Sequence, residues 1–110
     1  FLGQENDAVW SISARERLRS KCLCQLGALG RFWESARDWE RAAQTYHKAI
    51  DIQVDAEEYY QRLMRAYHAL GRSSETAAVY RRCRETLLAT CNREPSATTE
   101  AVRRELTVTA

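Results

Sequence analysis

The chain has 110 residues, a length that suits one domain with a single core. Hydrophobic residues make up 45% of it and charged residues 29%, proportions that exclude a disordered chain. The formal net charge of +2 is too small to indicate nucleic-acid binding by itself, and no apolar run is long enough to span a membrane. Because glycine and proline are scarce and no strand-like alternation is sustained, we expect helices to dominate.

The first expected helix follows an entry segment over residues 1–12. Ser13 and Glu16 have the spacing of a capping box, so the helix should begin there and run to about Ser35. Asp38 is then placed to cap a second helix that ends near Ile52.

Two more helices are expected in the second half of the chain. Asp55 and Glu58 form another capping-box pattern, which predicts a helix to about Leu70 that Gly71 terminates. Ser73 or Ser74 should cap the next helix, which runs to about Thr90.

The last expected helix, from Ser96 as its cap to about Leu106, follows the turn "NREPS". Its residues Ala101, Val102 and Leu106 can cover the exposed end of the preceding helices.

An internal repeat organises these helices. When the sequence is shifted along itself, "RDWERAAQTYHKAI" falls on "GRSSETAAVYRRCR". The shift aligns residues of similar size or aromatic character: Leu26 with Tyr60, Leu29 with Leu63, Trp33 with Tyr67, Ala42 with Thr76, Tyr46 with Tyr80, and Ala49 with Cys83. Small residues on either side of an aromatic, three and four apart, lie on one helix face and allow close helix packing.

This spacing and the length of the shift are those of tetratricopeptide repeats, whose period is about 34 residues. We therefore predict an all-α, tetratricopeptide-like superhelix of antiparallel helix pairs with about five helices. Residues 13–92 would form two helix pairs, and residues 93–110 a C-terminal capping helix within the same domain.

The cysteines and histidines suggest neither a metal site nor catalysis. On a helix, Cys22 and Cys24 point about 200° apart, which does not suit zinc. With Cys83 and Cys91 they are expected to be free thiols that behave as small apolar residues. The sequence shows no catalytic triad order and no glycine-rich phosphate loop, so we predict neither an enzyme nor a cofactor.

A concave face of the helix stack is the first candidate site. By repeat register, this face should carry polar side chains from both copies: Arg31, Glu34, Ser35, Gln61, Arg65 and His68. Such a groove would suit a peptide of acidic character, whereas the alternative is a solvated face without a ligand.

A basic cluster on the fourth helix is the second candidate. Arg81, Arg82 and Arg84 could contact phosphates or an acidic partner. The more economical interpretation is solubility and interaction with the helix dipole, which we favour. The run Arg15, Arg17, Arg19 and Lys21 alternates with period two, so on a helix it spreads around the cylinder and makes no single patch.

Three segments resemble a known family: "RERLRSK", "YYQRLMRAYHALGRSSETAAVYRRCRETL" and "EPSATTEAVRREL". They are similar in order and spacing to the bacterial transcriptional activator domain, the tetratricopeptide-like module of SARP-type regulators and of large LuxR- and MalT-like activators.

Two features of this sequence depart from the family. Its domain usually begins earlier, with helices that pack on the first repeat, so we expect an exposed apolar edge here. Its usual glycine before the Glu-Pro-Ser segment is replaced by "TCNRE", where Asn92 tolerates the left-handed conformation.

The resemblance implies a cytoplasmic regulatory module in transcription and signal transduction. In this family a separate domain reads DNA, and the helical module contacts other domains of the parent regulator, the transcription machinery or a second copy of itself. A generic tetratricopeptide adaptor without a link to transcription is the main alternative. Direct nucleic-acid binding by the arginine-rich fourth helix is a third possibility, which the low net charge opposes.

Overall fold

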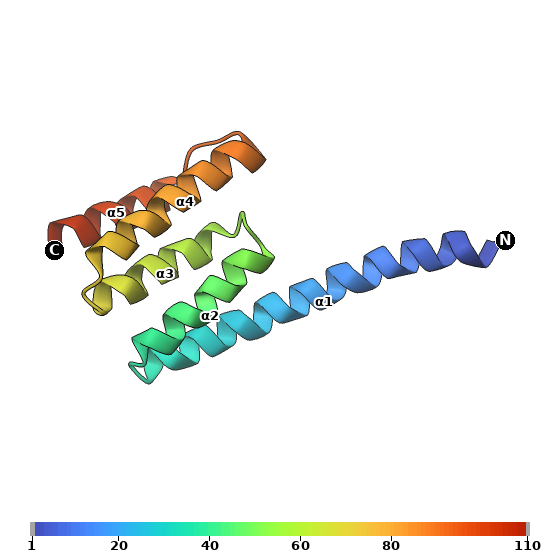
Figure 1. Ribbon diagram of the computed structural model, residues 1–110, viewed down its shortest axis with the longest axis horizontal. Helices are drawn as coiled ribbons and strands as arrows, with labels where there is room; N and C mark the ends of the chain where they lie inside the picture. The colour runs from blue at the N-terminus through green and yellow to red at the C-terminus, as the bar shows by residue number, and fades with distance from the viewer. Residues whose placement is uncertain (1, 110) are drawn as a thin grey trace.

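The computed structural model describes residues 2–109, with side chains for residues 13–106. Its described part is all-α and consists of five helices: α1 (Leu2–Ser35), α2 (Trp39–Ile52), α3 (Glu57–Ala69), α4 (Ser73–Cys91) and α5 (Ala97–Thr109). Consecutive helices from α1 to α4 pack side by side, and α5 packs back onto α3 (Figure 1). The predicted helical-repeat fold is therefore confirmed.

The helix α1 is longer than predicted, and its N-terminal half projects well beyond the other helices (Figure 1). The start predicted at Ser13 is wrong, because the helix runs through Ser13 and Glu16 from Leu2. Residues 2–12 contain no proline and only one glycine, so nothing in this segment stops a helix from continuing. The predicted entry segment is therefore the first part of α1.

The start of α2 agrees with the prediction. Asp38 occupies the N-cap position and accepts a hydrogen bond from the backbone N–H of Arg41 at 3.1 Å. Arg37 just before it has a φ of 61°, so the chain reverses between α1 and α2 through one left-handed residue.

The predicted side-chain caps of α3 and α4 are wrong, although both helices begin close to the expected positions. Ala56 and Arg72 occupy the N-cap positions, and neither side chain accepts a hydrogen bond from a backbone N–H of its helix. The Asp55 carboxylate instead accepts a hydrogen bond from Gln53 Nε2 at 2.5 Å. Before α4, the Arg72 N–H donates back to the Tyr67 carbonyl across Gly71, so Ser73 already lies inside the next helix.

The two turns that need a left-handed residue have one. Gly71 has a φ of +74°, and it ends α3 as predicted. Asn92 has a φ of 52° at the end of α4, which confirms that asparagine can replace a glycine there. Ser96 precedes α5, and its hydroxyl accepts a bond from the Thr99 N–H at 3.4 Å.

The repeat positions form the core. Ala42, Ala49 and Cys83 are fully buried and Thr76 nearly so, while Tyr46 fills the space between α1 and α3. The other repeat positions, Trp33, Tyr67 and Tyr80, are partly buried and pack against this core.

The aligned pair that differs most in burial is Leu29 and Leu63. Leu63 is fully buried, whereas Leu29 is 44% exposed. The reason is position in the stack: α3 contacts α2, α4 and α5, whereas α1 packs mainly on α2.

Candidate functional site

Two residues of the predicted groove bond to the protein's own last helix, although Arg65 stays exposed. On α3, Gln61 Nε2 donates to Thr99 Oγ1 at 2.9 Å, and Arg65 forms an ion pair of 3.5 Å with Glu105. Both partners lie on α5. This surface of α3 therefore faces α5, and His68 in its last turn lies beside a cavity that is described below.

The other half of the predicted groove lies on α1 and is mostly exposed. Glu34 is the exception, since it accepts hydrogen bonds from the Tyr46 hydroxyl and from Arg62, whose Nη1 is 3.1 Å away. Burial of the phenol, together with this carboxylate, raises the pKa of Tyr46. Arg31 and Ser35 are exposed. Arg62 thus connects the α1 part of the predicted groove to α3, and peptide binding at the six groove residues stays a prediction.

The basic cluster of α4 is split by ion pairs. Arg82 binds Asp51 of α2 at 2.9 Å, and Arg84 lies 3.3 Å from Glu94 in the turn after α4. Arg81 forms no ion pair with any side chain of the described part of the chain. The three guanidinium groups therefore have different surroundings, and phosphate binding by the cluster stays a prediction.

The longest uncovered surface in the described region is an apolar strip along α1. Leu18, Leu29 and Phe32 are 65%, 44% and 59% exposed. Leu29 and Phe32 follow Leu18 by about three and about four turns of the helix, so all three lie on one side of α1. We call these three residues the α1 strip. The apolar edge that the family resemblance led us to expect is present.

The opposite side of α1 explains which of its faces is buried. At Gly30 an added Cβ would overlap the ring of Tyr46, and at Gly27 it would lie 2.7 Å from the hydroxyl of Tyr59. The two tyrosine rings stack at 6.0 Å between centroids. Glycines on one face thus let α2 and α3 approach α1 closely, which leaves the α1 strip pointing away from the core.

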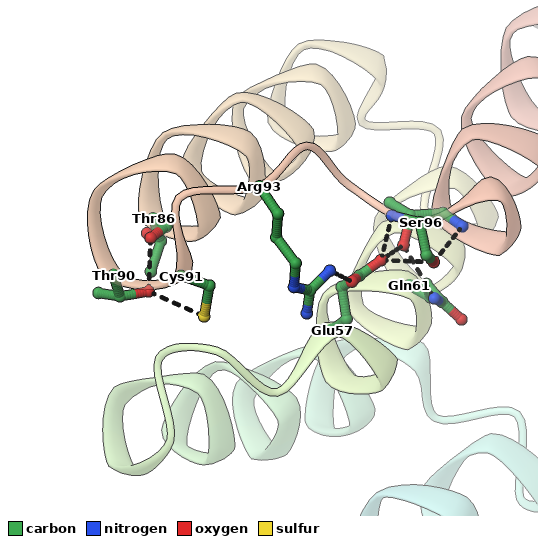
Figure 2. Close-up of polar contacts among 8 residues, drawn as sticks. Glu57, Gln61, Thr86, Thr90, Cys91, Arg93 and Ser96 are labelled. Carbon is green, nitrogen blue, oxygen red and sulfur yellow. Dashed lines mark hydrogen bonds and ion pairs between the residues drawn. The ribbon is translucent and has the colours of Figure 1, made fainter.

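A partly buried carboxylate fixes the turn before α5. Glu57 accepts hydrogen bonds from Arg93 (2.7 Å), from the N–H and hydroxyl of Ser96 (2.9 and 2.7 Å), and from the Thr99 hydroxyl (Figure 2). Burial opposes the charge, but these hydrogen bonds outweigh it and hold the pKa of Glu57 at about 2. Sequence reasoning missed this residue, because its partners lie far away in the sequence and no local pattern connects them.

The thiols do not behave alike. Cys83 is buried, and desolvation raises its pKa to about 12, so it acts as a small apolar residue, as predicted. That prediction is wrong for Cys22, Cys24 and Cys91, which are free but exposed. Within the described residues no group of three or more His, Cys, Asp or Glu side chains could hold a metal ion.

The capping role of α5 is partly as expected. Val102 and Leu106 are buried at 4% and 7% exposure, whereas Ala101, predicted to join them, is exposed. Helix geometry explains this, because Val102 and Leu106 are four residues apart and share the side that faces α3.

Taken together, these helices define an all-α helical-repeat protein of tetratricopeptide type. The sequence model of the family "bacterial transcriptional activator domain" matches residues 1–107, so the chain belongs to that family. No curated protein and no solved structure matches the chain. The family is one of regulatory domains and not of enzymes. In the part of the chain that the structure describes, no helix is long and apolar enough to cross a membrane.

Proposed function

We propose that this domain is a regulatory protein-interaction module of a bacterial transcriptional activator. It acts through protein contacts, while DNA binding resides in another domain of the parent protein, in the cytoplasm where bacterial transcription takes place. The observation that carries the proposal is the α1 strip. Large apolar side chains that stay exposed along one side of a folded domain commonly mark a protein–protein contact.

The charges beside the strip specify the kind of partner. In the described start of α1, the exposed residues Arg15 and Lys21 lie about 60° from Leu18 around the helix, one on each side, whereas Glu16 lies on the far side. Glu16 is itself paired with Arg19 at 3.6 Å. A second copy docked on the same strip would bring like charges together, which is unfavourable. These charges support a partner with an apolar centre and acidic surroundings, and we propose that it is a protein of the transcription machinery.

Direct DNA binding is disfavoured by the surroundings of the α4 arginines. Arg82 and Arg84 are paired with carboxylates, and the chain as a whole carries a net charge of only +2. The carboxylates offset the positive charge of α4, so the long-range attraction on which non-specific DNA binding depends is small. Membership in an activator family also does not favour the generic adaptor that the repeat pattern alone left open.

Sedimentation of the purified chain, alone and mixed with purified bacterial RNA polymerase, tests the proposal. We expect a complex with the polymerase that the double change Leu18→Gln and Phe32→Gln weakens about tenfold or more, since central apolar contacts dominate interface energies. The matched control is Leu88→Gln, because Leu88 is 40% exposed on α4 and lies outside the strip.

Three results would contradict the proposal. One is a complex that the double variant forms as well as the wild type. Another is self-association of the chain through the strip without polymerase binding, which would make a second copy the partner. The third is a salt-dependent shift of duplex DNA with no protein complex, which would favour nucleic-acid binding.

A further inference from the structure

A cavity of about 390 Å³ lies between α4 and α5, over the surface of α3. The two helices are joined by the turn at residues 92–96, where Glu57 ties them to α3 (Figure 2). Away from this joint, α5 continues along α3 and leaves room beside α4. The lining comes from all three helices: Met64, His68, Ser73, Thr76, Ala77, Tyr80, Arg81, Arg84, Arg103 and Leu106.

The floor of the cavity is apolar. Met64 and Leu106 are buried at 1% and 7% exposure, and the small residues Thr76 and Ala77 leave space above them. The ring of Tyr80 forms part of the wall. A ligand that enters would therefore bury an apolar body against these side chains.

The rim of the cavity is cationic. Arg81 and Arg84 come from α4 and Arg103 from α5, and none of the ten lining residues is acidic. Arg81 forms no ion pair with the described side chains, so its charge is available to a ligand.

The other two arginines are partly engaged. The Arg103 guanidinium lies 4.5 Å from the centroid of the Tyr80 ring, which holds it at the rim, and 3.8 Å from Glu100. Arg84 pairs with the exposed Glu94 at 3.3 Å. Glu100 also accepts a hydrogen bond from the Tyr80 hydroxyl. Because exposed ion pairs contribute little, they do not prevent an anion from binding the same guanidinium groups.

We propose that this cavity binds a small organic anion, a carboxylate, sulfonate or phosphate ester with an apolar body. The apolar group would lie over Met64 and Leu106, and the anionic group would contact Arg81 and Arg103. The volume falls in the usual range of small-molecule sites, about 300–1,000 Å³. A guanidinium fork bonds oxyanions with two parallel hydrogen bonds, which explains the preference for this chemistry. The proposal concerns a ligand site and is independent of the protein contact at the α1 strip.

The probe 2-naphthoate tests this site, because it combines an apolar ring system with one carboxylate. Met64 is the single methionine of the sequence, so its ¹³C-labelled methyl group gives one resolved NMR signal at the cavity floor. We expect 2-naphthoate to shift this signal saturably. The neutral 2-naphthalenemethanol and inorganic sulfate should not, since each lacks one of the two features.

Two variants separate the contributions of charge and space. Arg81→Gln should weaken 2-naphthoate binding about tenfold, the effect of losing one charge-assisted interaction. Ala77→Leu should weaken it by filling the cavity without any change of charge. Arg104→Gln is the matched control, because Arg104 is an exposed residue of α5 outside the lining. Thermal unfolding followed by circular dichroism establishes that each variant is folded.

The proposal would be overturned if the neutral alcohol bound as tightly as 2-naphthoate, or if Arg81→Gln and Arg104→Gln had equal effects. A short peptide rich in Asp and Leu that shifts the Met64 signal, where 2-naphthoate does not, would replace the small molecule with a protein segment. None of these results depends on polymerase binding, so this proposal and the proposed function can fail separately.

Discussion

At Gly30, one missing side chain decides how closely two helices pack. The ring of Tyr46, fully buried, lies against the backbone of α1 at this point. Glycine lowers the stability of a helix, so its presence here reflects contact between helices and not local helix preference. From the sequence alone, Gly30 would indicate only that the helix is locally less stable at this position.

The change Gly30→Ala is therefore expected to destabilise the protein by about 1–3 kcal/mol through overpacking against Tyr46. Helix propensity alone would predict the opposite, that this change stabilises the protein by about 0.5–1 kcal/mol. Urea unfolding of the wild type and the variant distinguishes the two, and a stabilised variant would show that α1 and α2 are further apart than described here.

Glu57 makes the stability of the protein depend on pH. Its folded pKa of about 2 lies below its ordinary value of 4.5, so the carboxylate favours the folded state above pH 4.5. This contribution to the free energy of unfolding, about 3 kcal/mol, should disappear as the pH falls from about 5 to 2.

Urea unfolding between pH 7 and pH 2 measures the effect. We expect Glu57→Gln to be less stable than the wild type at pH 7, and the difference to shrink toward pH 2. Glu58→Gln is the control, since Glu58 is a neighbour whose side chain is 63% exposed and pairs only with Arg62. Equal pH dependence of the unfolding free energy in the wild type and Glu57→Gln would contradict the stabilising role of the hydrogen bonds that Glu57 accepts.

At the scale of the helices, their ends show where local sequence signals are reliable. Asp38 caps α2 because its carboxylate reaches the N–H of a residue three positions later. The similar pattern at Asp55 failed, because the chain there bonds Asp55 to Gln53 and begins α3 after Ala56. A capping pattern thus shows that a turn is near, but the path of the chain decides which residue becomes the cap.

Comparison of two alanine variants tests this difference. Asp38→Ala should cost about 1 kcal/mol of unfolding free energy, the usual value of an N-cap. Asp55→Ala should cost less, because its carboxylate bonds to Gln53 and, within the described residues, to no helix N–H. Chemical unfolding at neutral pH measures both, and a larger loss at Asp55 would restore the capping box that the sequence suggested.

At the scale of the whole molecule, the described helices differ in how much of their surface is covered. The central helix α3 contacts α2, α4 and α5, whereas residues 13–22 of α1 are all exposed. Local opening requires less free energy where fewer tertiary contacts are lost.

Hydrogen exchange of the isolated monomer should reflect this arrangement. We expect amides near Leu63 and Met64 to exchange most slowly, and amides near Leu18 to exchange many-fold faster. Addition of a partner that binds the α1 strip should slow hydrogen exchange of the amides near Leu18 and leave exchange near Leu63 and Met64 unchanged. Equal protection of both regions in a chain shown by sedimentation to be monomeric would contradict this account.

The sequence by itself determined the helical class, the internal repeat, the small and aromatic residues of the core and the turn at Gly71, because all of these depend on spacing along the chain. Only the tertiary structure decided which polar surfaces remain available. The packing of α5 on α3 bonds Gln61 and Arg65 to Thr99 and Glu105 and leaves a cavity beside Arg81. The hydrogen bonds that Glu57 accepts and the exposure of Leu29 also depend on contacts between distant residues, which spacing along the chain does not encode.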